Sequence, residues 1–174
     1  MVGYALDGPE GRGYTLKMLE LLPDDYFMRE ALRQAQKAYA ADEVPVGAVV
    51  VREGKIIGRA HNQVELLKDA TAHAEMVALT QAEAAVGDWC LTDCDLYVTK
   101  EPCVMCAGAI VHTRIRRVIF GCADPTGGAA GSMMNLLRMQ SLNHRCQITS
   151  GVLQNECAAI LQDFFRRRRT EQTG

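Results

Sequence analysis

The residues with the clearest chemical potential lie in two short segments about thirty residues apart. The segment "TAHAEM" places His73 and Glu75 as H-x-E, and "VTKEPCVMC" places Cys103 and Cys106 as C-x-x-C directly after Pro102. A C-x-x-C pair by itself serves redox chemistry, a structural zinc or half of a catalytic zinc site. The chemistry of the two cysteines therefore depends on which other residues reach them.

Each segment is expected just inside the start of a helix. Cys103 and Cys106 are three residues apart, so both sulfurs lie close together around a helix and can reach one ion. The free N–H groups and the dipole of a helix N-terminus also favour thiolates. His73 and Glu75 would diverge in mid-helix, but in a first turn both can lean beyond the helix end. Two helix N-termini directed at one point would thus form the floor of a site.

One histidine and two cysteines supply three zinc ligands and leave the fourth position open. Structural zinc sites close all four positions, whereas catalytic sites keep one for water. Zinc lowers the pKa of bound water from about 16 toward ~7, which makes hydroxide available at neutral pH. Glu75 is the only acid within two residues of a ligand in the H-x-E segment, so we expect it to be the general acid and base.

Two structural explanations compete with this catalytic site. Glu75 could simply be a capping residue near a helix start. A structural zinc site could instead use four thiolates, those of Cys90, Cys94, Cys103 and Cys106. Against that site, "DWCLTDCDLYV" leads Cys94 directly into a predicted strand, and the segment around His73 would have no role.

The overall composition predicts one soluble, cytoplasmic globular domain. The chain has 174 residues, and domains usually have about 100–200. Its apolar runs fall far short of the ~20 residues that span a membrane, and no signal peptide is recognisable. The formal net charge of −2 argues against a general affinity for nucleic acid, so RNA binding would need a local basic segment such as Arg166–Arg169.

The seven cysteines favour reduced thiols over a disulfide scaffold, because their number is odd and they are scattered. Those outside the candidate zinc sites are most simply small buried hydrophobic residues, namely Cys122, Cys146 and Cys157.

The predicted elements alternate between helix and strand. Asp24 or Asp25 is expected to cap a first helix, whose apolar residues recur at helical spacing to Ala38. The others are a hairpin over 44–51 and 55–60, a helix over 71–86, a strand over 95–99, a helix over 103–112, a strand over 116–122, a glycine-rich loop over 124–132 and a helix over 153–168. This order predicts an α/β fold, a three-layer α-β-α sandwich with a mixed sheet. Residues 24–170 form its single domain, and residues 1–23 a loose extension with a turn of helix over 16–22.

H-x-E followed by P-C-x-x-C is the known signature of zinc-dependent nucleobase deaminases. Segments from about Asp24 to Arg168 further resemble the bacterial tRNA-specific adenosine deaminase family, namely "EVPVGAVVV", "EPCVMCAGAIVHTRIRRVIFG", "GAAGS", "NHR" and "NECAAILQDFFRRRR". The resemblance implies a cytidine-deaminase-like fold, one Zn2+ per subunit, a homodimer, and hydrolysis of the wobble adenosine in a tRNA anticodon stem-loop to inosine. Deaminases of free nucleobases or nucleotides share the zinc site and remain the alternative.

The resemblance also assigns roles by position. It implies that His73, Cys103 and Cys106 bind zinc, that Glu75 transfers protons, and that the substrate-binding residues are Asn62, Asp124 and Arg166. Each substrate-binding residue also has a structural alternative. Asn62 could form a turn at the end of the hairpin, and Asp124 could form a turn before Pro125. Arg166 could compensate the dipole at the C-terminal end of its helix.

The sequence departs from the family pattern at three positions near these motifs. Lys100 stands where an apolar residue is expected before "EPC", Ala70 where a proline is expected before "TAHAE", and Thr126 where the family often carries lysine. None of them is a zinc ligand, so they bear on how the RNA is held.

Overall fold

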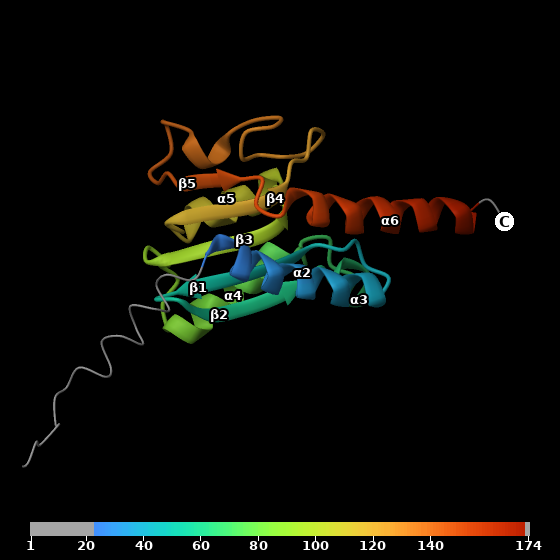
Figure 1. Ribbon diagram of the computed structural model, residues 1–174. Helices are drawn as coiled ribbons and strands as arrows, with labels where there is room; N and C mark the ends of the chain where they lie inside the picture. The colour runs from blue at the N-terminus through green and yellow to red at the C-terminus, as the bar shows by residue number, and fades with distance from the viewer. Residues whose placement is uncertain (1–22, 173–174) are drawn as a thin grey trace, which may run out of the picture.

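The structure, a computed structural model, describes residues 23–172 and forms three layers around one mixed sheet (Figure 1). The sheet has five strands in the order β2-β1-β3-β4-β5. Strand β1 runs antiparallel to β2 and β3, while β3, β4 and β5 are mutually parallel. The elements in chain order are α2 (Asp24–Ala40), β1 (Gly47–Arg52), β2 (Lys55–His61), α3 (Val64–Leu67), α4 (Ala74–Val86), β3 (Cys94–Lys100), α5 (Val104–His112), β4 (Arg117–Cys122), the 3-10 helix η1 (Leu136–Arg138), β5 (Gln147–Ser150) and α6 (Gln154–Gln172). The predicted α/β sandwich with a mixed sheet is confirmed.

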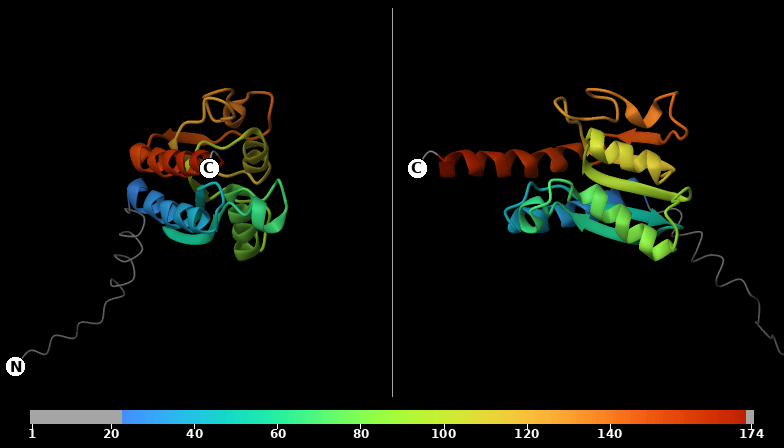
Figure 2. Two further views of the ribbon diagram at one scale, coloured as in Figure 1. Left: turned by 90° about the vertical axis from the view of Figure 1, so that its right-hand side faces the viewer. Right: turned by 180° about the vertical axis from the view of Figure 1, so that it is seen from behind.

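Helices cover both faces of the sheet (Figure 2). Helices α2 and α6 lie on one face, and α4 and α5 lie on the other. The central strands β1, β3 and β4 are buried along almost their whole length, as expected for a sheet with two covered faces. None of the helices in residues 23–172 is both long enough and apolar enough to cross a membrane.

Close backbone approaches hold the helices against the sheet. At Gly58 in β2, a Cβ atom would lie 2.5 Å from the carbonyl oxygen of Ala78 in α4. At Gly47 in β1, a Cβ atom would lie 2.0 Å from the carbonyl oxygen of Ala31 in α2. Only glycine permits this packing distance, so these two positions set how closely α4 and α2 lie on the sheet.

Several element boundaries differ from the prediction. The helix expected from Thr71 begins at Ala74, because Thr71 belongs to a turn in which its backbone N–H and hydroxyl donate to Asp69. The helix expected to begin at Cys103 starts one residue later. The final helix begins and ends later than expected, and it extends beyond the ends of the strands (Figure 1).

The predicted aspartate cap of α2 is wrong. Pro23 occupies the N-cap position, and no side chain caps this helix. Asp24 instead accepts hydrogen bonds from Tyr97 and Arg117, which join the first turn of α2 to β3 and β4. The helical turn expected over 16–22 lies outside the described residues.

Candidate zinc site and substrate pocket

Three side chains with zinc-binding atoms meet at the N-terminal ends of α4 and α5. The ligand atoms of His73, Cys103 and Cys106 all lie within 4.8 Å of one another. His73 Nδ1 is 3.6 Å from each of the two sulfurs. Zn–S bonds of ~2.3 Å and a Zn–N bond of ~2.0–2.1 Å at a tetrahedral angle would separate sulfur and nitrogen by about 3.6 Å. The cluster therefore has the dimensions of a zinc site and is typical of zinc deaminases.

Helix geometry explains why these residues converge. His73 and Cys103 are the N-cap residues of α4 and α5, and both have extended backbone conformations. An N-cap side chain lies beside the free N–H groups that open the helix. Cys106 follows one turn into α5 and is buried. The prediction that two helix N-termini form the floor of one site is confirmed.

The two thiols differ in acidity because they share a hydrogen bond. Donation from Cys106 to the Cys103 sulfur, supported by His73, lowers the pKa of Cys103 to about 3. The same hydrogen bond and burial raise the pKa of Cys106. Cys103 is thus the more acidic of the two thiols, and a zinc ion would bind both cysteines as thiolates and release their protons.

Glu75 lies in the first turn of α4 beside this cluster. Its side chain is buried, with the residue only 4% exposed. Burial raises the pKa of Glu75 to about 7, although the positive charge of His73 acts in the opposite direction. Near neutral pH this carboxyl can both accept and donate a proton.

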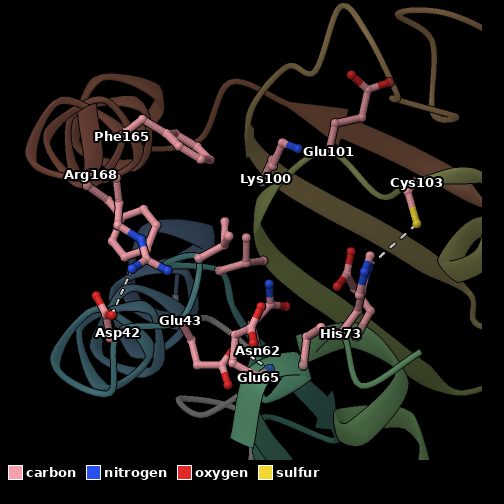
Figure 3. A pocket seen from close by; sticks show the side chains of 15 residues that line it. Asp42, Glu43, Asn62, Glu65, His73, Lys100, Glu101, Cys103, Phe165 and Arg168 are labelled. Carbon is pink, nitrogen blue, oxygen red and sulfur yellow. Dashed lines mark hydrogen bonds and ion pairs between the residues drawn. The ribbon is translucent and has the colours of Figure 1, made fainter. Parts of the chain in front are cut away.

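The cluster lies at one end of a pocket with a volume of about 370 Å³ (Figure 3). His73 and Cys103 lie at that end, while Phe165 and Arg168 of α6 lie at the other. Asn62 and Glu75 also line the pocket. The structure therefore joins the predicted zinc ligands to the predicted base-binding residue Asn62. It also joins them to the C-terminal helix, which is remote in the sequence.

Asn62 connects β2 to α4. Its Oδ1 accepts a hydrogen bond of 2.9 Å from the backbone N–H of Ala74, one of the free donors of the first helical turn. Asn62 is buried and lines the pocket, so it is more than a turn residue at the hairpin end.

Asp124 does not line the pocket and performs the turn chemistry that was its structural alternative. Its Oδ1 accepts hydrogen bonds from the backbone N–H groups of Thr126 and Gly127 and from the Thr126 hydroxyl. Its Oδ2 lies 2.6 Å from Lys100 Nζ. Lys100, and not Asp124, lines the pocket.

Arg166 does not line the pocket. It lies on the exposed side of α6, where it pairs with Asp163. Arg168 is the arginine of "FFRRRR" that reaches the pocket, and it donates to Asp42. The resemblance alone could not distinguish Arg166 from Arg168, which lies two residues further along the same helix.

Two buried acids that the sequence did not single out build the surrounding loops. Glu101 accepts hydrogen bonds from the backbone N–H groups of Asp124, Ala130 and Ser132, and from the Ser132 hydroxyl. Glu43 accepts hydrogen bonds from two backbone N–H groups at the start of α3. One sequence feature could have indicated the structural role of Glu101, namely its position directly after a buried strand and before Pro102.

The four-thiolate alternative is not assembled. Within residues 23–172, the metal-type cluster contains Cys103 and Cys106 but neither Cys90 nor Cys94. Cys94 begins β3, at the opposite end of that strand from the cluster, and its thiol lies against Asp93. The cysteines predicted to be buried hydrophobic residues are buried, namely Cys122, Cys146 and Cys157.

The five-stranded mixed sheet, its helical layers and the His-Cys-Cys cluster define a zinc-dependent deaminase with a cytidine-deaminase-like fold. The sequence model of the MafB19-like deaminase family matches residues 23–169. The tRNA-specific adenosine deaminase of Bacillus subtilis (strain 168) is 48% identical over 149 residues, which cover 86% of this chain and 92% of that protein. The chain belongs to the tRNA-specific adenosine deaminase family.

Solved structures agree with this membership. One from work on A-to-I editing by tRNA:A34 deaminases at the wobble position of transfer RNA has a TM-score of 0.76 and 44% identity, covering 78% of this chain and 99% of that chain. A guanine deaminase from Nitrosomonas europaea has a TM-score of 0.73 at 22% identity, covering 93% of this chain and 96% of that chain. The second likeness concerns the fold alone.

Proposed function

We propose that this protein hydrolyses the wobble adenosine of a tRNA anticodon to inosine and releases ammonia. The observation that carries the proposal is the convergence of His73, Cys103, Cys106 and Glu75 at the end of one pocket. That convergence occurs in a chain 48% identical to a tRNA-specific adenosine deaminase.

His73, Cys103 and Cys106 would hold the zinc ion. When bound, zinc supplies a water molecule acidic enough to act as hydroxide near neutral pH. Because the three side chains would supply only three of the four ligands of a tetrahedral zinc ion, this site fits the open, catalytic type.

Glu75 is proposed to move the protons of the reaction. Its carboxyl takes a proton from the attacking water and delivers it to N1 of the purine as the C6–O bond forms. The same carboxyl then takes the proton of the new C6 hydroxyl and passes it to the amino group, which leaves as ammonia when the C6–N bond breaks and the C6 carbonyl forms. A buried carboxyl beside the ligands has the position for both transfers.

The pocket requires the target adenosine to leave its stack. The His-Cys-Cys cluster lies at one end of the pocket, and C6 of a stacked adenine could not enter the pocket to reach it, so the nucleotide must be flipped out. We assign Asn62 to hold the flipped base, because it is the buried amide on the pocket wall. Phe165 and Arg168 at the other end offer an aromatic ring and a cation to neighbouring nucleotides.

The enzyme is further proposed to act as a homodimer in the cytoplasm, where tRNA is its partner. Exposed apolar side chains near the start of α5 and on both sides of η1 support an interface there, namely Val104, Met133, Met134 and Met139. Light scattering of the purified protein should give twice the mass of the chain. A concentration-independent monomer would contradict the dimer.

Incubation with an anticodon stem-loop carrying a wobble adenosine tests the activity. Inosine at that position, detected by sequencing, is the expected result, and a stem-loop with guanosine there is the control. Absence of inosine together with turnover of free guanine or cytosine would replace the proposal by the free-nucleobase alternative.

A further inference from the structure

Lys100 is the last residue of β3 and lies on the wall of the pocket, in Figure 3 between Cys103 and Phe165. Its side chain is 35% exposed, whereas its neighbours Thr99 and Glu101 are buried. A cation thus interrupts a buried strand end at the point where the strand meets the pocket.

Asp124 holds the ammonium group of Lys100 in place. The 2.6 Å contact uses Oδ2 of Asp124, while Oδ1 is occupied by donors from the loop that follows it. Within residues 23–172, Asp124 is the one ion-pair partner of Lys100. An ammonium group has three N–H donors, so two remain for a ligand.

Lys100 differs in charge from most of the other charged side chains that line the pocket. Most charged side chains that line it are acidic, namely Asp42, Glu43, Glu65, Glu75 and Glu101. The lining lysine and arginine side chains among the described residues are Lys100 and Arg168. Arg168 lies at the α6 end and pairs with Asp42. Lys100 is therefore the cation on the zinc side of an otherwise acidic pocket.

A nucleotide whose base reaches the zinc cluster must leave its phosphates farther out along the pocket wall. Phosphates carry full negative charge and would be repelled by the acidic lining unless a cation faces them. We propose that Lys100, positioned by Asp124, binds a phosphate of the RNA strand next to the reactive adenosine. This inference rests on the proposed function, because it takes an RNA strand as the substrate.

Measuring the Kd of the stem-loop at several salt concentrations tests whether the positive charge of Lys100 contributes to RNA binding. Lys100→Gln should weaken binding about tenfold and reduce the slope of log Kd against log salt by ~0.7, the value for one phosphate contact on a single strand. Lys100→Arg should restore most of the affinity. The matched control is Lys55→Gln, which removes an exposed lysine at the far end of β2 and should change neither quantity.

Stem-loops with a single neutral methylphosphonate on either side of the reactive adenosine identify the contact. For the wild-type protein, one of the two should weaken binding by about the same factor as Lys100→Gln. For Lys100→Gln, that methylphosphonate should have no further effect. A purely structural lysine would show additive losses, because it contacts no phosphate.

The outcomes separate this inference from the proposed function. Absence of inosine with the wild-type protein would overturn both. Normal inosine formation, with Lys100→Gln matching the wild type in affinity and salt slope, would overturn the phosphate contact alone. Fully additive losses with both methylphosphonates would overturn it as well. Unchanged zinc content and Tm in Lys100→Gln would exclude unfolding as the cause of weaker binding.

Discussion

At the scale of single residues, the burial of Glu75 beside three metal-binding side chains determines what this carboxyl can do. Among the described residues no lysine or arginine pairs with Glu75, and a buried acid without such a partner is expensive to keep unless its protonation serves the reaction. The capping alternative is thereby weakened, since the backbone N–H of Ala74 in the first turn of α4 donates to Asn62 and not to Glu75.

We expect Glu75→Gln to remove turnover and to keep the metal. The amide has nearly the same shape but cannot accept and return a proton, so the single-turnover rate should fall by about 10³-fold or more. Inosine sequencing measures the rate, and elemental analysis should still find about one zinc per chain. Loss of zinc in this variant would assign Glu75 to metal binding instead.

The ionised carboxylate of Asp124 stabilises the loop that follows it, so this residue makes the stability of the folded protein depend on pH. Burial alone would raise the pKa of Asp124, but hydrogen bonds from Lys100 and Thr126 outweigh it and lower the pKa to about 2. A group with a lowered folded-state pKa stabilises the protein above its unfolded-state pKa, and this stabilisation is lost as pH falls through the folded value.

Asp124→Asn should therefore be less stable than the wild type by at most about 2 kcal/mol at pH 7. The difference should persist down to about pH 5 and then disappear toward pH 2. Urea unfolding of both proteins across this range measures it. A difference that is constant with pH would show that the carboxylate charge contributes nothing.

The zinc ligands were predictable because their spacing along two helices is local. The contact of Lys100 with Asp124 and the contacts of Glu101 with the following loop could not be predicted in this way, since these partners are more than twenty residues apart in the sequence. Lys100 looked anomalous as an isolated lysine before "EPC", and its contact with Asp124 explains its position.

At the scale of elements, the distance between α4 and β2 helps to position Glu75, the carboxyl proposed to be catalytic. Gly58 lies against the backbone of Ala78, which is three residues after Glu75 on the same helix. A side chain at position 58 would have to push the helix away, because the atom it meets belongs to the backbone.

We expect Gly58→Ala to cost about 2–3 kcal/mol of stability and to slow inosine formation several-fold in protein that remains folded. The control is Gly108→Ala in α5, where a Cβ atom meets nothing within 4 Å. That change should leave stability unchanged or raise it by up to ~1 kcal/mol, because alanine favours a helix over glycine. Equal effects of the two substitutions on urea unfolding would contradict the packing explanation.

The long helices and apolar strands were predicted because their periodicity is strong. Helix α3 was missed because it has only four residues, and β5 because "QITS" is short and only partly buried. Strand β5 exists through its parallel pairing with β4, which tertiary structure supplies. The starts of α4 and α5 were placed too early because His73 and Cys103 occupy cap positions just outside the helices.

At the scale of the whole molecule, the zinc cluster joins two helices that the chain separates by β3. Helix α4 packs against β2 and β1, while α5 connects β3 to β4. The His-Cys-Cys cluster joins the N-terminal ends of α4 and α5. The sequence predicted the layers of this fold, but the strand order depends on which strands pair, and local pattern does not contain that information. An ion at this point should therefore stabilise the packing of the whole domain.

Removing zinc with a chelator should lower the Tm, and adding zinc should restore it. An ion present at 100 times its Kd stabilises a folded protein by about 2.7 kcal/mol, which corresponds to roughly 5–10 °C for a domain of this size. Calorimetry with and without the chelator measures the shift. The reason is that only the folded chain brings His73, Cys103 and Cys106 within reach of one ion.

Two variants determine where that ion binds. His73→Ala should lose the zinc-dependent shift in Tm, whereas the double variant Cys90→Ser and Cys94→Ser should keep it, because neither cysteine belongs to the cluster. The opposite pattern would place zinc in the four-thiolate site. It would also leave the pocket without the ion that deamination needs, so the same measurement bears on the fold and on the chemistry together.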